Sequence, residues 1–156
     1  MFFIVNFMIV WLAWMLFADK KRWRELLPVG ILGSALGSTT DNIMEHYKLW
    51  EYHGGGHPLI PALTDDWGIF LVIPYLFIQW LPKQQTFGNL FVYWFMWTGI
   101  TTGIEWIYVT TNHMHYHKWW HIGYSYLADW FLFCLFYQFH KNREVKETRT
   151  SKQTLL

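Results

Sequence analysis

The residues best suited to chemistry are acidic, histidine and serine side chains that lie within or beside long apolar stretches. These candidate pocket residues are Asp41, Glu45, His46, Glu105, His121, Ser125 and Asp129. An acidic side chain at the centre of a bilayer costs about 2.5 to 3.5 kcal/mol on insertion scales, so its retention needs a reason. Two interpretations stay open: hydrogen-bonded contacts between helices, or a site for a proton, an ion or a ligand.

A second candidate is a metal site in the run from Asn112 to His121. Its candidate ligands are His113, His115, His117 and His121. The first three would face one way on an extended segment, whereas the last two would share a face if a helix begins early. Either arrangement offers two imidazoles to zinc or another divalent metal, and Glu45 and Glu105 could add carboxylates. A stretch rich in Trp, Tyr and His is also typical of a membrane interface, and no HExxH motif is present.

Helical spacing places the polar residues on common faces. At about 100° per residue, three stripes form: Gly30, Ser34, Gly37, Asp41 and Glu45; Thr98, Thr102 and Glu105; and His121, Ser125 and Asp129. Small residues permit close helix approach and acidic residues avoid lipid, so each stripe should face the protein interior. We expect the stripes to converge on one outward-facing polar pocket, where Glu105 and His121 pair with each other or bind a cation together.

The composition predicts an all-α, polytopic transmembrane bundle. Of 156 residues, 53% are hydrophobic and only 15% charged, and the 12 Trp suit the two membrane interfaces. Five spans are predicted: Met1–Ala18, Val29–Tyr47, Gly68–Leu81, Leu90–Val109 and Trp119–Phe139. The third is short, but it can be extended backwards through residues 59–63. Residues 1–140 then form the membrane domain, and residues 141–156 form a polar cytoplasmic tail that we expect to be disordered or interfacial.

Basic residues set the orientation and support the weakly hydrophobic second span. With five spans and the N-terminus outside, the inner segments hold Lys20, Lys21, Arg22, Arg24, Lys83, Lys141, Arg143, Lys146, Arg149 and Lys152. The outer segments then hold only Lys48 and Lys118. Without the second span this bias disappears, so the positive-inside rule favours five spans with the C-terminus inside.

Several classes of function are disfavoured. The net charge of +1 and the lack of a basic patch argue against nucleic acid as a partner. Cys134 is the only cysteine, which excludes an intrachain disulfide or a CxxC site. The chain has no P-loop, GxSxG or GxGxxG motif, and it is small for a repeat-built transporter acting alone.

Short motifs recur along the chain: Glu45-His46 with Trp50 and Tyr52, Asp66-Trp67, Glu105 with Tyr108, and Trp119-Trp120 with Gly123. This series resembles a family of small multi-span membrane proteins from endospore-forming Gram-positive bacteria. The resemblance covers most of the chain before the tail. It implies a multi-pass protein of the bacterial plasma membrane or of the spore membrane, and it assigns no catalytic residue.

Three functional hypotheses follow. The first is a non-enzymatic membrane protein that binds a ligand or ion in its pocket or joins a larger membrane complex. The second is a membrane-embedded enzyme, metal-dependent or not, that acts on a lipid or another membrane substrate with its His, Glu and Asp residues. The third is an ion pathway in a homo-oligomer. The lipid bilayer is the expected partner in each case.

Overall fold

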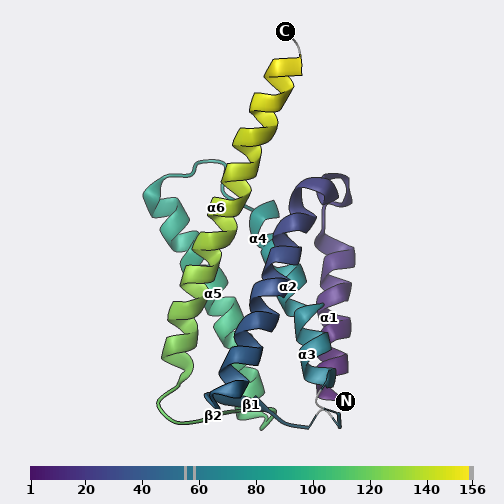
Figure 1. The fold of residues 1–156 in the computed structure, drawn as a ribbon, viewed down its shortest axis with the longest axis vertical. Helices are drawn as coiled ribbons and strands as arrows, with labels where there is room; N and C mark the ends of the chain where they lie inside the picture. Colours follow the sequence, from purple (N-terminus) through teal and green to yellow (C-terminus); the bar gives the residue numbers. More distant parts are fainter. Residues whose placement is uncertain (55, 58, 155–156) are drawn as a thin grey trace.

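The computed structural model describes residues 1–54, 56, 57 and 59–154, with side chains up to residue 146. The elements are α1 (Phe2–Phe17), the 3-10 turn η1 (Lys20–Arg22), α2 (Trp23–His46), β1 (Trp50–Tyr52), α3 (Leu59–Asp66), α4 (Ile69–Gln79), α5 (Phe87–Thr110), β2 (Met114–Tyr116) and α6 (Ile122–Thr154). The long helices stand beside one another, with the N-terminus and both strands at one end and the C-terminus beyond the other (Figure 1). The predicted all-helical architecture is therefore confirmed.

The second and third predicted helices have different boundaries in the structure. Helix α2 begins at Trp23, where Glu25 in its first turn suits the positive end of the helix dipole, so Pro28 lies inside the helix and not in its first turn. The third predicted helix is divided into α3 and α4. Its break lies at Gly68, whose φ of −109° and ψ of −91° are not helical, whereas Pro74 is accommodated within α4.

Helix α6 also departs from the prediction. It runs without a break from Ile122 to Thr154, so residues 141–154 are helical and not disordered. The alternative of an interfacial tail stays a prediction. Residues 155 and 156 lie outside the described part of the chain. His121 precedes the first helical residue, which removes it from the helical stripe that Ser125 and Asp129 share.

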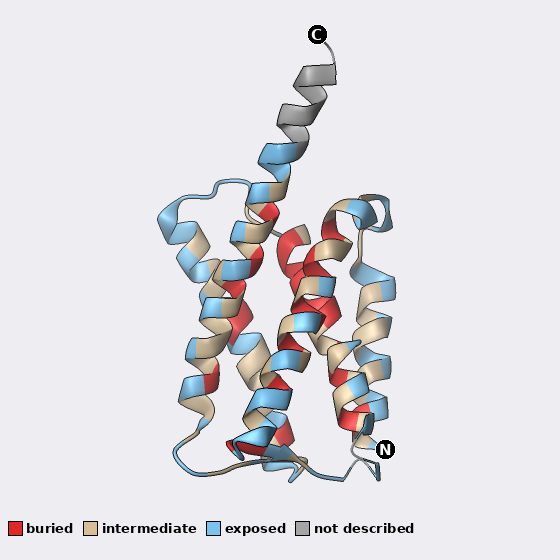
Figure 2. Cartoon of the chain, in the orientation of Figure 1, coloured by how far each residue is buried: buried red, intermediate tan, exposed pale blue. Residues whose placement is uncertain are grey.

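The small-residue face of α2 packs against α4. Of the predicted stripe, Gly30, Ser34, Gly37 and Asp41 are buried on α2, whereas Glu45 is exposed. Buried positions recur along α2 in Figure 2. A Cβ added to Gly37 would lie 2.4 Å from the ring of Phe70, so no larger side chain fits without movement. The glycines therefore permit a close contact between these two helices.

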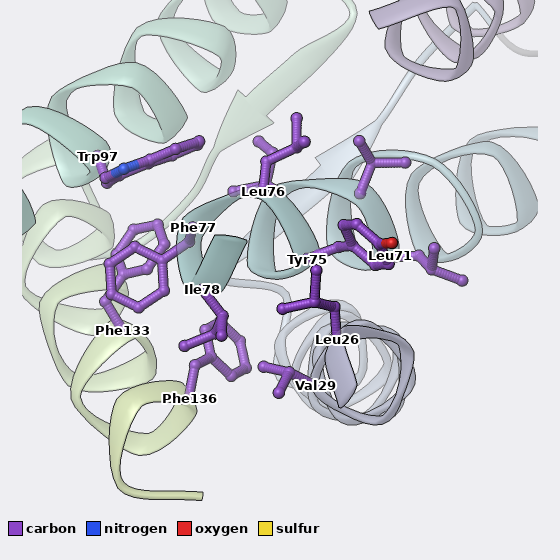
Figure 3. Packing of buried hydrophobic residues seen from close by; sticks show 12 residues of the cluster. Leu26, Val29, Leu71, Tyr75, Leu76, Phe77, Ile78, Trp97, Phe133 and Phe136 are labelled. Carbon is purple, nitrogen blue, oxygen red and sulfur yellow. The ribbon is translucent and has the colours of Figure 1, made fainter. Parts of the chain in front are cut away.

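Helix α4 is the central element of the bundle. Its residues from Leu71 to Ile78 are all buried. The core around it contains Leu26 and Val29 of α2, Trp97 of α5, and Phe133 and Phe136 of α6 (Figure 3). Because α4 is apolar on every side and surrounded by other helices, it fixes the spacing between α2, α5 and α6.

The two strands form an antiparallel pair that connects the ends of α2 and α5. Trp50 pairs with Tyr116, Glu51 with His115, and Tyr52 with Met114. Trp50 and Met114 are buried, while Glu51 and His115 are exposed, as strand alternation requires. The pair therefore presents one apolar and aromatic face to the bundle.

Large apolar side chains cover the outside of several helices. Examples are Met8, Ile9 and Leu12 on α1, Phe91, Phe95 and Met96 on α5, and Leu127 and Phe131 on α6. Among the described residues, one helical segment, Leu59–Gln79, is long and apolar enough to cross a membrane. A second qualifies only if Phe2–Phe17 and Lys20–His46, bent by 96°, are one broken span. The structure thus has one or two candidate membrane helices by length and composition.

Candidate ligand-binding cavity

A cavity of about 140 Å³ lies between α2, α4, α5 and α6, next to the inner face of the strands. Its aromatic wall includes Trp50, Tyr52, Phe70, Tyr108, Trp120 and Phe133. Four acidic residues also line it: Asp41, Asp65, Glu105 and Asp129. Its volume is close to that of an engineered protein cavity of about 150 Å³ that binds benzene, so it has room for a small ligand.

Glu105 has the most hydrogen-bond donors of the four acidic residues. Its Oε1 accepts a hydrogen bond from the Tyr116 hydroxyl on β2 and another from the Ser125 hydroxyl on α6, each at 2.6 Å. The Trp120 indole nitrogen donates in turn to the Ser125 hydroxyl at 3.1 Å. These bonds fix Glu105 of α5 relative to the strand pair and to the start of α6.

The other three acidic residues each accept a hydrogen bond from one hydroxyl group. Thr101 of α5 donates to Asp129 of α6 at 2.6 Å. Tyr108 of α5 donates to Asp65 at the end of α3 at 2.8 Å. Tyr52 of β1 donates to Asp41 of α2 at 3.4 Å, the longest of the three. Every acidic group in the cavity is therefore oriented by a hydroxyl donor from a different element of the fold.

The structure brings together four of the seven pocket residues that the sequence suggested. Asp41, Glu105, Ser125 and Asp129 line the cavity. Glu45, His46 and His121 are exposed instead. Glu45 and His46 belong to the last turn of α2, and the His121 ring accepts a hydrogen bond from the backbone N–H of Gly123 at 3.1 Å. The strands lie over the cavity at this end, so the predicted outward-facing pocket is partly covered.

Sequence reasoning missed Asp65 and the strand tyrosines that donate hydrogen bonds to the acidic residues of the cavity. Asp65 precedes the predicted third span, whereas in the structure it belongs to the last turn of α3 and is only 3% exposed. Tyr52 and Tyr116 alternate with exposed residues along β1 and β2. This period of two was a signal that could have indicated two short strands with one buried face.

The candidate metal ligands of the histidine run lie away from the cavity, and two of them, His115 and His117, lie near His53 and Glu51 of the facing segment. The His113 ring stacks on Phe2 with 3.9 Å between ring centroids. His117 lies 2.9 Å from a carboxylate oxygen of Glu51, and its hydrogen bond lowers the pKa of Glu51. The rings of His115 and His53 lie 4.7 Å apart. The histidine run therefore lies on the outside of the strand pair, and no histidine among the described residues lines the cavity.

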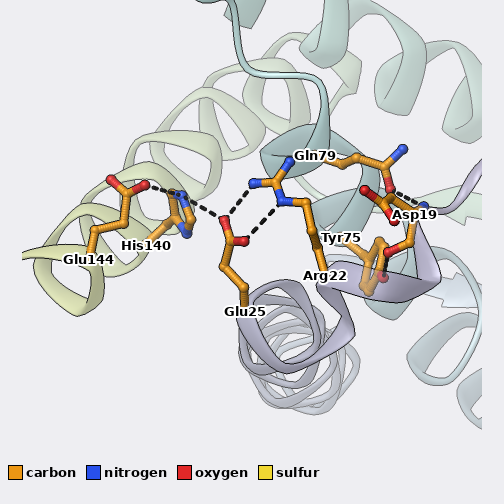
Figure 4. A network of polar contacts seen from close by, with 7 residues as sticks. All are labelled: Asp19, Arg22, Glu25, Tyr75, Gln79, His140 and Glu144. Atoms are coloured by element: carbon orange, nitrogen blue, oxygen red, sulfur yellow. Dashed lines mark hydrogen bonds and ion pairs between the residues drawn. The ribbon is translucent and has the colours of Figure 1, made fainter. Parts of the chain in front are cut away.

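A different group, at the other end of the bundle, could hold a metal ion. Ligand atoms of Glu25, His140 and Glu144 lie within 4.8 Å of one another, although the sequence did not suggest this set (Figure 4). Glu25 precedes the predicted span of α2, and His140 follows the predicted span of α6. Arg22 donates two hydrogen bonds to Glu25 and lowers its pKa, while burial lowers the pKa of His140. A metal ion would have to compete with the Arg22 guanidinium for Glu25.

The fold and the cavity together define a helical bundle that encloses an acidic pocket with aromatic walls. No protein-family model, no curated protein and no solved structure matches this chain. The resemblance to membrane proteins of endospore-forming bacteria therefore stays a prediction.

Proposed function

We propose that this chain is an integral membrane protein of five spans that binds a small ligand in the cavity between α2, α4, α5 and α6. The observation that carries the proposal is the cavity itself. It combines a volume of about 140 Å³ with four acidic residues, each oriented by a hydroxyl group. Binding sites for small molecules commonly combine apolar walls with a few oriented polar groups.

The membrane location is supported by the outer surface of the bundle. Monomeric soluble proteins rarely expose apolar patches larger than a few hundred Å². Here α1, α5 and α6 all present large apolar side chains outward. The turn that contains Lys20 and Arg22, the loop that contains Lys83, and the basic end of α6 lie together, away from the strands (Figure 1). This arrangement matches five spans with the basic end in the cytoplasm of a bacterial cell or spore.

A purely structural role for the acidic residues explains the cavity less well. Carboxyl groups that serve only as contacts between helices are expected to be closely packed, because protein interiors contain few voids larger than a water molecule. Asp65 and Asp129 come from different helices and yet border the same open volume. A set of polar groups oriented around an open cavity favours occupation by a ligand.

The alternative functions have less support. A metal-dependent enzyme would use imidazoles near its carboxylates, but the candidates His113, His115, His117 and His121 do not line the cavity that holds the acidic residues. An ion pathway through an oligomer would need an open route, whereas Trp50 and Met114 of the strand pair are buried next to the cavity. A role as an accessory subunit of a membrane complex is compatible with a bound ligand.

The five-span topology predicts opposite accessibility for two loops. In a Cys134→Ser background, a cysteine at His57 should react with a membrane-impermeant thiol reagent added to intact cells, and a cysteine at Lys83 should not. Both positions are exposed in the structure, so burial would not explain a difference. Lysed cells provide the control, because both cysteines should then react. Labelling at Lys83 in intact cells would refute the topology.

Ligand binding predicts a removable small molecule in the native protein. Native mass spectrometry of protein extracted gently from its own membrane should show an additional bound mass. Ala128 lines the cavity, so Ala128→Phe should fill it and abolish the bound mass. Ala35→Phe, on an exposed position of α2, is the matched control and should retain it. A bound mass that persists in folded Ala128→Phe protein, or its absence from the wild type, would refute the proposal.

A further inference from the structure

The charged side chains that line the cavity are all acidic. Among the residues that the structure describes, it is lined by acidic side chains and by no Lys, Arg or His. Carboxylates removed from water destabilise a protein unless each is protonated or compensated by a positive charge. The missing positive charge can therefore be supplied by whatever occupies the cavity.

Glu105 retains the capacity to accept a further hydrogen bond or ion pair. Both of its hydroxyl donors bind Oε1, and no described residue donates to Oε2. Asp129 likewise uses only Oδ2 for its hydrogen bond with Thr101. These oxygens are the natural partners of a cation within the cavity.

Aromatic walls provide a second kind of recognition for a cation. The ring centroids of Trp50 and Trp120 lie 5.3 Å apart, those of Tyr52 and Tyr108 lie 6.4 Å apart, and all four residues line the cavity. The faces of such rings attract quaternary and protonated ammonium groups, and the attraction is stronger where water is excluded. Inorganic cations would gain much less from this apolar surface.

Trp50 adds an independent indication of a ligand. It is only 7% exposed, and its indole N–H has no acceptor among the described residues, as is also true of Trp14 and Trp94. Of these three indoles, only that of Trp50 belongs to a residue that lines the cavity. Buried N–H donors are nearly always satisfied. An occupant that carries an oxygen atom would satisfy this donor.

We propose that the cavity binds a small organic ammonium ion that carries a hydroxyl oxygen. This inference rests on the proposed function, since it names the class of ligand for the same cavity. The ammonium group interacts with the carboxylates and aromatic rings, and the hydroxyl oxygen accepts from Trp50. A phosphorylated relative of the ligand, such as a lipid headgroup, is disfavoured because its phosphate would face the same four acidic residues.

Choline and its neutral isostere, 3,3-dimethylbutan-1-ol, test the inference because they have nearly the same shape and differ in charge. Thermal unfolding of the full chain in detergent is measured with each compound, with phosphocholine, and with sodium chloride at equal ionic strength. Choline at about 100 times its Kd should raise the Tm by about 5 °C or more. The other three additions should have much smaller effects.

Two variants locate the effect. Asp129→Asn combined with Glu105→Gln should remove most of the response to choline, whereas Glu45→Gln on the exposed end of α2 should keep it. Equal stabilisation by choline and by its neutral isostere would overturn the ammonium inference. It would also be overturned if choline had no effect on the Tm while the wild type carried a bound mass that the Ala128→Phe protein lacked. Both results would leave the cavity as a ligand site. A bound mass retained in Ala128→Phe protein would instead overturn the proposed function.

Discussion

Replacing Gly33 by leucine should cost about 3 kcal/mol or more of the free energy of unfolding, at the upper end of what overpacking a core position usually costs. A Cβ at this position would lie 2.2 Å from the backbone oxygen of Phe70 and 2.6 Å from Cγ of Pro74. Neither atom belongs to a flexible side chain that could move aside. The α2–α4 contact must therefore open, and with it the core around α4.

Two other glycines provide the comparison. Gly37→Leu should cost about 1 to 3 kcal/mol, because its Cβ meets the Phe70 ring, which can change rotamer. Gly99→Leu is the control, because a Cβ at Gly99 meets nothing within 4 Å and leucine is the better helix former. Denaturant or thermal unfolding in detergent measures all three. Equal stability of the Gly33 and Gly99 variants would show that α2 and α4 are not in close contact.

The hydrogen bond between Asp65 and Tyr108 should give the largest coupling energy in the cavity. Both residues are buried, at 3% and 4% exposure, and Tyr108 also accepts a hydrogen bond from Asn6 of α1. Tyr108→Phe should cost about 1 to 3 kcal/mol, because it leaves a buried acceptor without its donor. Together with Asp65→Ala it should be non-additive by about 1 kcal/mol or more in a double-mutant cycle.

A second double-mutant cycle, on Glu105 and His121, is the control for the cycle on Asp65 and Tyr108. It also tests the pairing that the sequence suggested. The structure gives these residues different partners, so Glu105→Gln and His121→Ala should be additive within about 0.5 kcal/mol. Strong coupling here would support a shared site for these two residues. Additivity for Asp65 and Tyr108 would contradict the hydrogen bond between these two residues.

The sequence by itself determined the helices and the directions in which they face. The apolar runs and the stripe of Gly30, Ser34, Gly37 and Asp41 depend only on local spacing, since helical periodicity places such residues on one face. The same argument placed Ser125 and Asp129 on the side of α6 that lines the cavity. It failed for Glu45, which is exposed in the last turn of α2, and for His121, which lies one residue before α6 begins.

The tertiary structure alone decided how the cavity is closed and which donors orient its acidic groups. Residues 50–52 pair with residues 114–116, far away in the sequence, and this contact places Tyr52 and Tyr116 beside acidic residues of α2 and α5. Asp65 belongs to the site because the helix is interrupted at Gly68 and α3 packs against α1. Contacts between distant segments depend on the packing of the whole bundle, so they cannot be predicted from the local pattern of residues.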